Sequence, residues 1–440
     1  MKIDIPAGAK EVLGQLHKKG FEAYIVGGCV RDALMGRCPN DWDITTSALP
    51  AEVKDCFQKT IDTGIEHGTV TVRMHGESYE VTTYRIDGKY EDGRHPTSVT
   101  FTPSLTEDLK RRDFTVNAMA WNEEEGLVDL FGGMEDIERR IIRCVGDPRS
   151  RFSEDALRML RALRFSAQLD FVIEENTFSA ISELAETLTK ISAERIQVEL
   201  LKLIISPHPE RMMEVYQSGL SKVFFPEWDA MCTCTQNSKH HAYDVAEHTI
   251  VVMQNVPGEK MIRLAALLHD VAKPICKKTD PKGADHFSGH PTLGAKMAVQ
   301  ILRRLKFDNA TIDSVERLVR YHDERPEMTK RNVRRLMHRM GSDCIPDLVA
   351  LKRADIAGQS DYNRQEKLHR VDELERLYRE ILKDGEAVTI KDLKVNGQDV
   401  MEVAGKSGPE IGRVLKELLD EVIEDPSKND REYLLHRIGQ

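Results

Sequence analysis

The sequence predicts an α/β domain at the start of the chain and an almost entirely helical remainder. Up to residue 140, short segments alternate apolar and polar residues and are rich in β-branched side chains, which is typical of strands. From residue 147 onward, apolar residues recur at helical spacing. Examples of the two patterns are TVTVRM (residues 69–74), YEVTTYRI (79–86) and ALRMLRALRF (156–165). The predicted fold class is therefore an α/β head, with a mixed sheet and helices, followed by an all-α remainder.

A pair of aspartates in the head predicts a metal site. Asp41 and Asp43 lie one residue apart, and on a strand their side chains would point to the same face. Parallel carboxylates repel each other unless a cation lies between them, and an all-oxygen site favours a hard ion such as Mg²⁺. Glu80 opens another predicted strand and could supply a third carboxylate, although an exposed strand glutamate would look the same.

Glycines and an arginine beside this pair are typical of phosphate binding. The strand predicted for FEAYIVGG (residues 21–28) runs into a glycine turn, and a short helix is expected to follow. Gly28 lets the backbone approach a polyanion, and Arg31 adds a forked donor for phosphate. A glycine turn, an arginine and two aspartates together indicate phosphoryl transfer, in which a metal bridges the phosphates while cations hold the tail.

Composition narrows the class of protein. The 440 residues carry a formal net charge of −10, yet arginines crowd the region from 139 to 164, so a local phosphate-binding face is compatible with an acidic chain. The start of the chain has no apolar signal region, and no apolar run approaches membrane length. The eight cysteines are scattered without a C-x-x-C pair. We expect a reduced, cytoplasmic protein with no membrane partner.

Five motifs resemble, in order, those of class II tRNA nucleotidyltransferases, the CCA-adding branch of the polymerase β superfamily. They are GGCVRDALMGRCPNDWDITTSALP, TGIEHGTVTV, KRRDFTVNAMA, DLFGGMEDI and SEDALRMLRALRF, and they fall within residues 20–205. The resemblance implies an enzyme that adds C, C and A to the 3′ end of tRNA from CTP and ATP with Mg²⁺. It also implies site residues by motif match: Asp41 and Asp43 as catalytic Mg²⁺ ligands, and Gly28, Arg31, Arg112, Asp155, Arg158, Arg161 and Arg164 as nucleotide-binding residues.

The spacing of Asp155 and Arg158 indicates how bases could be selected. Residues three apart share a helix face, and there an aspartate accepts a hydrogen bond while an arginine donates one. Cytosine and adenine both present an amine beside a ring-nitrogen acceptor, whereas guanine and uracil present a carbonyl beside an N–H. Unpaired buried polar groups cost about 1–3 kcal/mol each, so such a pair would accept C and A and refuse G and U.

A second metal site is predicted in the helical half. Seven of the fifteen histidines fall between residues 240 and 322, and LAALLHDVAKP places His269 beside Asp270. The segments VAEHT, LLHD, SGHPTLGA, RYHDE and KRADIAG resemble those of HD phosphohydrolases over residues 240–360. That resemblance implies one divalent metal, of unknown identity, on His248, His269, Asp270 and Asp355, with His290 and His322 suited to a second. It also implies phosphohydrolase activity on RNA ends.

The predicted organisation is a nucleotidyltransferase head (1–140), a helical neck (141–230), an HD domain (231–360) and a helical tail (361–440). Two alternatives to a full CCA-adding enzyme stay open: an A-adding enzyme or poly(A) polymerase with the same head, and an HD metal phosphohydrolase whose head only docks RNA. In the family, the loop at residues 85–99 is associated with the switch from C to A addition, so its presence argues against an enzyme that adds only C. The sequence leaves the oligomeric state open.

Overall fold

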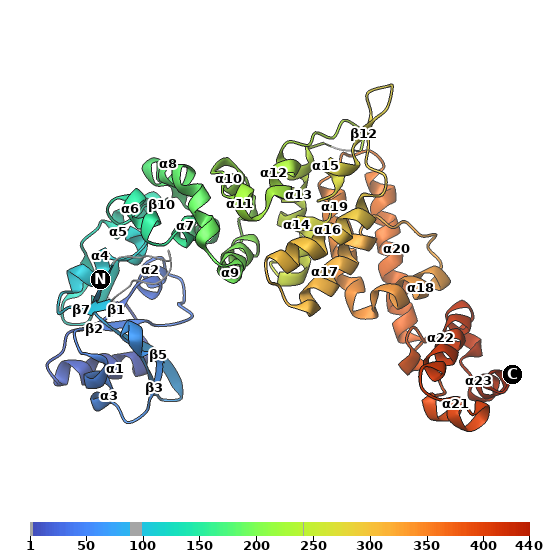
Figure 1. Ribbon diagram of the computed structural model, residues 1–440, viewed down its shortest axis with the longest axis horizontal. Coiled ribbons are helices and arrows are strands. Elements are labelled where there is room, and N and C mark those ends of the chain that lie inside the picture. The colour runs from blue at the N-terminus through green and yellow to red at the C-terminus, as the bar shows by residue number, and fades with distance from the viewer. Residues whose placement is uncertain (1–2, 89–98, 241) are drawn as a thin grey trace. The chain divides into compact units, whose positions relative to one another are not determined.

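The computed structural model describes residues 3–88, 99–240 and 242–440, and the chain forms two compact units, residues 1–226 and 227–440 (Figure 1). The predicted switch loop includes Arg94 and falls largely on residues 89–98, which lie outside the described residues. The division into head, neck, HD domain and tail stays a prediction.

Unit 1 is built on a seven-stranded sheet with the order β3-β4-β5-β2-β1-β8-β9. Strand β2 pairs antiparallel with β1 and parallel with β5, so the sheet is mixed, as predicted. Along β1, Ala23 and Ile25 belong to one buried core and Tyr24 and Val26 to another, because alternate side chains face opposite sides of the sheet. The sheet strands are β1 (Ala23–Val26), β2 (Ile44–Thr46), β3 (Thr60–Gly64), β4 (Thr69–Met74), β5 (Glu77–Thr83), β8 (Met119–Asn122) and β9 (Gly126–Asp129).

Helices cover the sheet, and the part of unit 1 that follows the sheet consists mainly of helices. Two short strand pairs lie outside the main sheet, β6 (Arg85–Asp87) with β7 (Val99–Phe101) and β10 (Ile141–Ile142) with β11 (Val172–Ile173). The helices of unit 1 are α1 (Ala7–Lys18), α2 (Gly28–Leu34), α3 (Pro50–Cys56), α4 (Leu105–Lys110), α5 (Gly133–Arg139), α6 (Pro148–Glu154), α7 (Leu157–Leu169), α8 (Glu175–Leu184), α9 (Ala193–Ile204), α10 (Met212–Gln217) and α11 (Ser221–Phe224). Helices α7 and α9 pack against each other.

Unit 2 is helical except for one small hairpin. Its first part packs α13, α14, α17 and α19 together, and its last three helices enclose a separate small core. The elements are α12 (Pro226–Cys232), which starts at the unit boundary, α13 (Val245–Gln254), α14 (Lys260–Leu268), α15 (Lys273–Cys276), β12 (Lys278–Thr279), β13 (Asp285–His286), α16 (His290–Arg304), α17 (Asn309–Tyr321), α18 (Lys330–Met340), α19 (Ile345–Ala357), α20 (Arg364–Lys383), α21 (Gly397–Ala404), α22 (Pro409–Glu424) and α23 (Arg431–Ile438).

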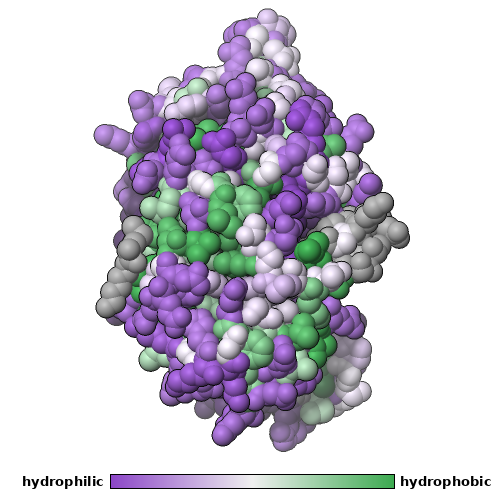
Figure 2. Space-filling model, turned by 90° about the vertical axis from the view of Figure 1, so that its left-hand side faces the viewer, coloured by the Kyte–Doolittle hydropathy of each residue, from purple (hydrophilic) through white to green (hydrophobic). Residues whose placement is uncertain are grey.

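The surface is predominantly polar. Hydrophilic residues cover most of the face seen in Figure 2, with hydrophobic patches between them. Large hydrophobic side chains that unit 1 exposes include Leu49, Ile61 and Ile65. Within the described ranges, every helix is too short or too polar to cross a bilayer.

Candidate functional site

The predicted head residues gather at one edge of the sheet. Strand β1 ends there at the Gly27–Gly28 turn, and the antiparallel strand β2 begins there directly after Asp43. The N–H of Val26 donates to the carbonyl of Asp43 at 3.0 Å, which holds the aspartate segment beside the glycine turn. Strand β5 runs parallel to β2 with Val81 opposite Ile44, so Glu80 lies level with Asp43. Segments far apart in the sequence therefore meet at this edge.

The prediction that Asp41 and Asp43 lie on a strand is wrong. Strand β2 starts at Ile44, and both aspartates belong to the irregular segment before it. The physical reason is the partner strand: β1 ends at Val26, and Gly27 turns the backbone away with a φ of 83°, so no ladder exists for Asp41 to join. Both side chains are exposed.

The charges at this edge favour a cation. Loss of hydration and the negative charges of Asp41 and Glu80 raise the pKa of Asp43 to about 6, while Arg112 opposes the rise. An oxygen-only donor set of this kind suits Mg²⁺. In the described part of the chain, however, three ligand atoms within 4.8 Å of one another are found only in unit 2.

Arginines close to the glycine turn are held by short-range contacts. Arg31 is buried and donates through Nη1 to Oδ1 of Asn117 at 2.6 Å. Arg112 packs so close to Gly27 that a Cβ there would lie 3.0 Å from its Nη1, which explains the glycine in physical terms. The Nε of Arg112 is buried and lacks a hydrogen-bond partner among the described residues. The arginine side of the predicted phosphate cradle is thus assembled, with donor capacity left on Arg112.

The predicted helix face that Asp155 and Arg158 would share is not formed. Helix α6 ends at Glu154 and α7 begins at Leu157, and Asp155 between them has an extended backbone with φ −139° and ψ 104°. Its carbonyl accepts from the Arg158 N–H at 3.0 Å and its Oδ1 from the Leu157 N–H at 3.0 Å, so Asp155 starts α7 instead of continuing α6. A side chain that satisfies the first free N–H groups of a helix interrupts the preceding helical run.

The three arginines of α7 are each engaged by an acidic partner. Arg158 donates to Oε2 of Glu154 at 2.5 Å, and Arg164 donates to Oε2 of Glu199 at 2.5 Å. Arg161 forms two bonds with Oδ2 of one aspartate, at 2.8 and 2.6 Å. That partner is Asp113, which directly follows Arg112 in the sequence.

Four residues that the sequence analysis did not assign hold the predicted ones in place. Asn117 fixes Arg31, Asp113 fixes Arg161, Arg195 donates to Asp155 at 2.7 Å, and Phe165 lies against three arginines. The motif KRRDFTVNAMA contains Asp113 and Asn117, so their polar character four residues apart was a usable signal. The contact of Arg195 had none, because the two partners are 40 residues apart.

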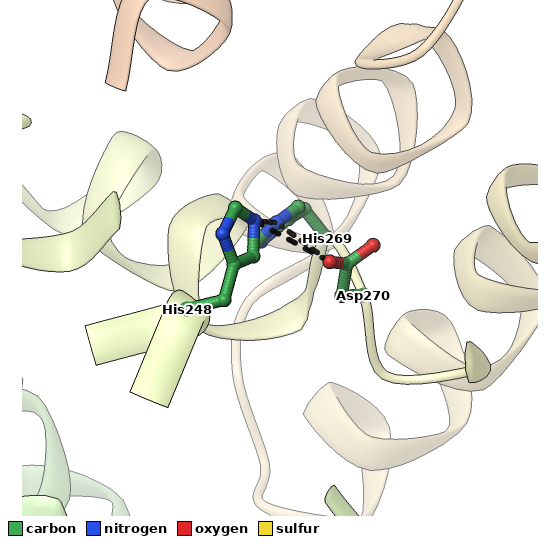
Figure 3. Close-up of side chains that lie close together, drawn as sticks. All are labelled: His248, His269 and Asp270. Atoms are coloured by element: carbon green, nitrogen blue, oxygen red, sulfur yellow. Dashed lines mark hydrogen bonds and ion pairs between the residues drawn. The ribbon is translucent and has the colours of Figure 1, made fainter. Parts of the chain in front are cut away.

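The predicted HD residues of unit 2 converge on a buried centre. His248 comes from α13, His269 and Asp270 follow α14, and Asp355 comes from α19. The Nε2 atoms of His248 and His269 lie 3.2 Å apart, and each is within 3.6 Å of Oδ2 of Asp270 (Figure 3). Oδ1 of Asp355 lies 3.0 Å from Nε2 of His248. The ligand atoms of His248, His269 and Asp270 lie within 4.8 Å of one another, close enough for one metal ion, and Asp355 meets this group through its contact with His248.

A second pair of histidines meets the other oxygen of Asp270. Nε2 of His290 lies 3.3 Å from Oδ1 of Asp270, and Nε2 of His322 lies 3.8 Å from it. The two Nε2 atoms are 3.3 Å apart. Two sets of three ligand atoms therefore share Asp270, one set on each carboxylate oxygen.

The tautomers of all four histidines are set by the backbone. Each Nδ1 lies 2.7 to 2.9 Å from a carbonyl oxygen, of Gly358, Ala266, Phe287 and Val319 respectively. A carbonyl only accepts, so each Nδ1 must donate, which leaves Nε2 as the metal-facing atom. Gly358 is needed for this approach, because a Cβ there would lie 2.8 Å from Nδ1 of His248.

Electrostatics and access also suit a metal. Burial by itself would raise the pKa of Asp270, but His269 and Lys273 hold it well below its usual range. Burial and the charge of His269 lower the pKa of His322 to about 4, so its ring is neutral at pH 7. A cavity of about 620 Å³ opens on the site, and its lining includes Asp270, His290, His322 and Asp355 of the ligand set, the cations Lys239, Lys273 and Arg325, and the carboxylates Asp285 and Asp323. Cations beside the metal ligands provide contacts for an anionic substrate.

Comparisons with known proteins agree along the whole chain. Residues 23–143 match the poly(A) polymerase head domain, residues 170–232 the RNA- and SrmB-binding site of polymerase A, and residues 291–438 domain 2 of tRNA nucleotidyltransferases. The CCA-adding enzyme of Limosilactobacillus fermentum is 36% identical over 447 residues, which covers 100% of this chain and 99% of that protein. The three matched ranges leave out residues 233–290, where His248, His269, Asp270 and His290 lie.

Solved structures give the same result. The crystal structure of the Bacillus stearothermophilus CCA-adding enzyme in complex with CTP has a TM-score of 0.72 and 31% identity, over 98% of this chain and 96% of that one. The Thermotoga maritima CCA-adding enzyme complexed with tRNA shares the fold, with a TM-score of 0.56 and 22% identity over 98% of this chain and 93% of that one. With its mixed-sheet head, its helical remainder and its full-length relatives, the chain belongs to the family of CCA-adding enzymes, the tRNA nucleotidyltransferases.

Proposed function

We propose that this protein adds C, C and A to the 3′ end of tRNA, with CTP and ATP as substrates and Asp41 and Asp43 as the Mg²⁺ ligands. The observation that carries the proposal is the convergence of Gly28, Asp43 and Arg112 at one sheet edge, in a chain that is similar over its full length to CCA-adding enzymes. Nucleotidyltransferases of this fold use a divalent metal. The eight cysteines, all within the described ranges, are free thiols, in keeping with the cytoplasmic location expected from the sequence.

The reaction joins the terminal 3′ oxygen of tRNA to the α-phosphorus of the nucleotide and breaks the bond to pyrophosphate. When bound, Mg²⁺ would lower the pKa of the attacking hydroxyl and offset the charge that develops on the phosphates. In this proposal Asp41 and Asp43 would hold the ion. Gly28, Arg31 and Arg112 would hold the triphosphate, with backbone N–H groups and guanidinium donors.

We further propose that Asp155 and Arg158 select the base. Asp155 would accept the exocyclic amine that cytosine and adenine share, and Arg158 would donate to the adjacent ring nitrogen. Arg158 now donates to Glu154 and to the carbonyls of Arg151 and Arg111, so these contacts must yield or be shared when a base enters. Arg161 and Arg164 are each already bound to a carboxylate, so they would form part of the wall of the nucleotide pocket.

The test is primer extension on tRNA transcripts that end at the discriminator base, at C or at CC. Each is incubated with CTP, ATP, GTP or UTP, singly and in pairs, and the 3′ ends are sequenced. Stepwise C, C, A addition that is lost in Asp41→Ala supports the proposal. Extension of the CC end alone would identify an A-adding enzyme, and repeated A addition would identify a poly(A) polymerase.

A second activity is favoured by the histidine–aspartate centre of unit 2. We propose that His248, His269, Asp270 and Asp355 hold one divalent metal, that Asp270, His290 and His322 hold another, and that the site hydrolyses phosphate esters at RNA ends. The tautomers locked toward Nε2 and the lysine and arginine side chains in the cavity lining support this proposal. A bound metal would activate the water that attacks phosphorus, and Lys239, Lys273 and Arg325 would hold the phosphate oxygens.

Two single substitutions separate the activities. Asp270→Ala should abolish release of phosphate from RNA with phosphorylated ends and spare nucleotide addition, whereas Asp41→Ala should do the opposite. The content of metal bound to unit 2, measured per chain by inductively coupled plasma mass spectrometry in Mg²⁺-free buffer, should fall in Asp270→Ala and not in Asp41→Ala. Loss of nucleotide addition in Asp270→Ala, with no metal in the parent protein, would contradict the second proposal.

A further inference from the structure

The side chain of Asp155 is fixed by two donors from different parts of unit 1. Its Oδ1 accepts the N–H of Leu157 at 3.0 Å, and its Oδ2 accepts Nη2 of Arg195 at 2.7 Å. Arg195 lies in the first turn of α9, which packs along α7. The side chains of Arg195 and Asp155 are only 22% and 15% exposed, so water competes weakly for this contact. The orientation of the carboxylate is therefore set by helix packing as well as by its own backbone.

This orientation matters because base selection depends on what Asp155 can offer. A carboxylate has only acceptors, so it accepts the amine of cytosine or adenine and repels the carbonyl of uracil or guanine. A carboxylate that rotated out of this position would no longer present an acceptor to the amine, and the discrimination would be lost. The guanidinium of Arg195 opposes that rotation, because it holds Oδ2 in place through a charge-assisted hydrogen bond.

Among the described residues, one nitrogen of the Arg195 guanidinium finds no hydrogen-bond acceptor. Its Nη1 atom is buried and lacks a hydrogen-bond partner among the described residues, whereas the similar pair of Arg149 and Glu183 on the surface is bidentate, at 2.8 and 2.6 Å. Leaving a buried donor unpaired is costly. The surface pair shows that an arginine of this unit can meet a carboxylate with two nitrogens, whereas Arg195 meets Asp155 with one.

We infer that Arg195 is a positioning residue for base selection: it holds the Asp155 carboxylate in the orientation in which it accepts from the base, so that C and A are accepted and U and G refused. The inference rests on the proposed role of Asp155 in reading the base. It adds a residue from outside the motif that contains Asp155 and Arg158, and it makes α9 a part of the specificity machinery.

The test compares Arg195→Gln and Arg195→Lys with the parent enzyme. The ratio of kcat/KM for CTP to that for UTP, and of ATP to GTP, is measured on tRNA ending at the discriminator base and at CC. In Arg195→Gln the ratios should fall by about 13- to 160-fold, the equivalent of one lost buried hydrogen bond to a charged group. Arg195→Lys keeps the charge and should recover part of the ratio. Each ratio is taken within one preparation, so a lower folded fraction does not change it.

Two further variants make the outcomes distinct. Arg149→Gln removes an arginine–glutamate pair from the surface of the same unit and should leave both ratios unchanged. Asp155→Asn keeps the acceptor toward Leu157 but places a donor where Oδ2 stood, so it should raise the use of UTP. If Asp155→Asn shifts the ratios and Arg195→Gln does not, the inference is overturned while the role of Asp155 stands. If neither variant shifts them, the proposed base reading by Asp155 fails as well.

Discussion

Replacing Phe165 with leucine should destabilise unit 1 and loosen three arginines at once. The ring lies in α7, is 7% exposed, and meets the ring of Phe114 edge-on at a centroid distance of 5.8 Å. The guanidinium carbons of Arg164, Arg31 and Arg161 lie 3.8, 5.2 and 5.5 Å from its centroid. One aromatic side chain therefore contacts arginines from the glycine turn and from the neck.

The expected loss follows from these contacts. Leucine keeps most of the apolar volume, so the change of shape by itself should cost about 1 kcal/mol. The buried contact with Arg164 is worth about 2 kcal/mol, and each of the more distant arginines about 0.5 kcal/mol. The edge contact with Phe114 adds about 1 kcal/mol. We expect a loss of about 4–5 kcal/mol, most of which reflects the ring and not its size.

The assay is urea unfolding, with Phe171→Leu as the matched control. Phe171 is 1% exposed in the same part of the chain, and no cation lies over its ring among the described residues. Its substitution should cost about 1 kcal/mol. Phe165→Leu should in addition raise KM for CTP, because Arg31, Arg161 and Arg164 lose their common support. Equal losses of stability in the two variants, with KM unchanged, would refute the reasoning.

Three further predictions concern metal, acid and helix propensity. Chelation should lower the unfolding temperature of the parent protein, and adding Mn²⁺ should restore it. The double variant His290→Ala/His322→Ala should retain one metal per chain by mass spectrometry. Unchanged metal content in this variant would contradict a centre in which two metals share Asp270. Hydrogen bonds from Thr279 and Asn237 lower the pKa of Asp285 to about 2, so its stabilisation is complete above the unfolded pKa near 4 and is lost as the pH falls toward 2. Asp285→Asn should flatten the acid limb of urea-unfolding stability between these pH values, and an unaltered limb would count against this. Gly412 is exposed inside α22, and a Cβ at that position would meet nothing within 4 Å, so Gly412→Ala should stabilise the protein by about 1 kcal/mol. Gly133→Ala should destabilise it, because the added Cβ would strike the carbonyl of Thr115. Thermal melts that rank the two variants in the opposite order would disprove the argument.

The mixed-sheet head and the helical remainder could be predicted because their periodicities are local. Alternation along residues 69–74 and helical spacing along residues 156–165 are properties of a few neighbouring residues, and the structure has β4 and α7 there. The start of β2 could not be read in the same way. It depends on where its partner β1 ends, and therefore on the turn at Gly27.

The residues of the candidate sites likewise divide into those that the sequence could predict and those that it could not. Residue types and motif order pointed to Asp41, Asp43 and the histidine–aspartate set, because metal ligands are chemically distinctive. The break at Asp155 was missed, since an aspartate at a helix junction and one inside a helix look alike in a sequence. The supporting contacts of Arg195 and Phe165 were missed because each depends on how separate helices and strands pack.

The two-unit organisation allows the two proposed activities to be lost independently during evolution. Every residue proposed for nucleotide transfer belongs to residues 1–226, and every residue of the histidine–aspartate centre belongs to residues 227–440. A lineage that no longer needed the second centre could lose its histidines one by one without altering a single group that handles CTP, ATP or the tRNA end. Presence of one activity in a relative is thus no guide to the other, and the histidines of each homologue must be inspected individually before a second activity is assigned to it.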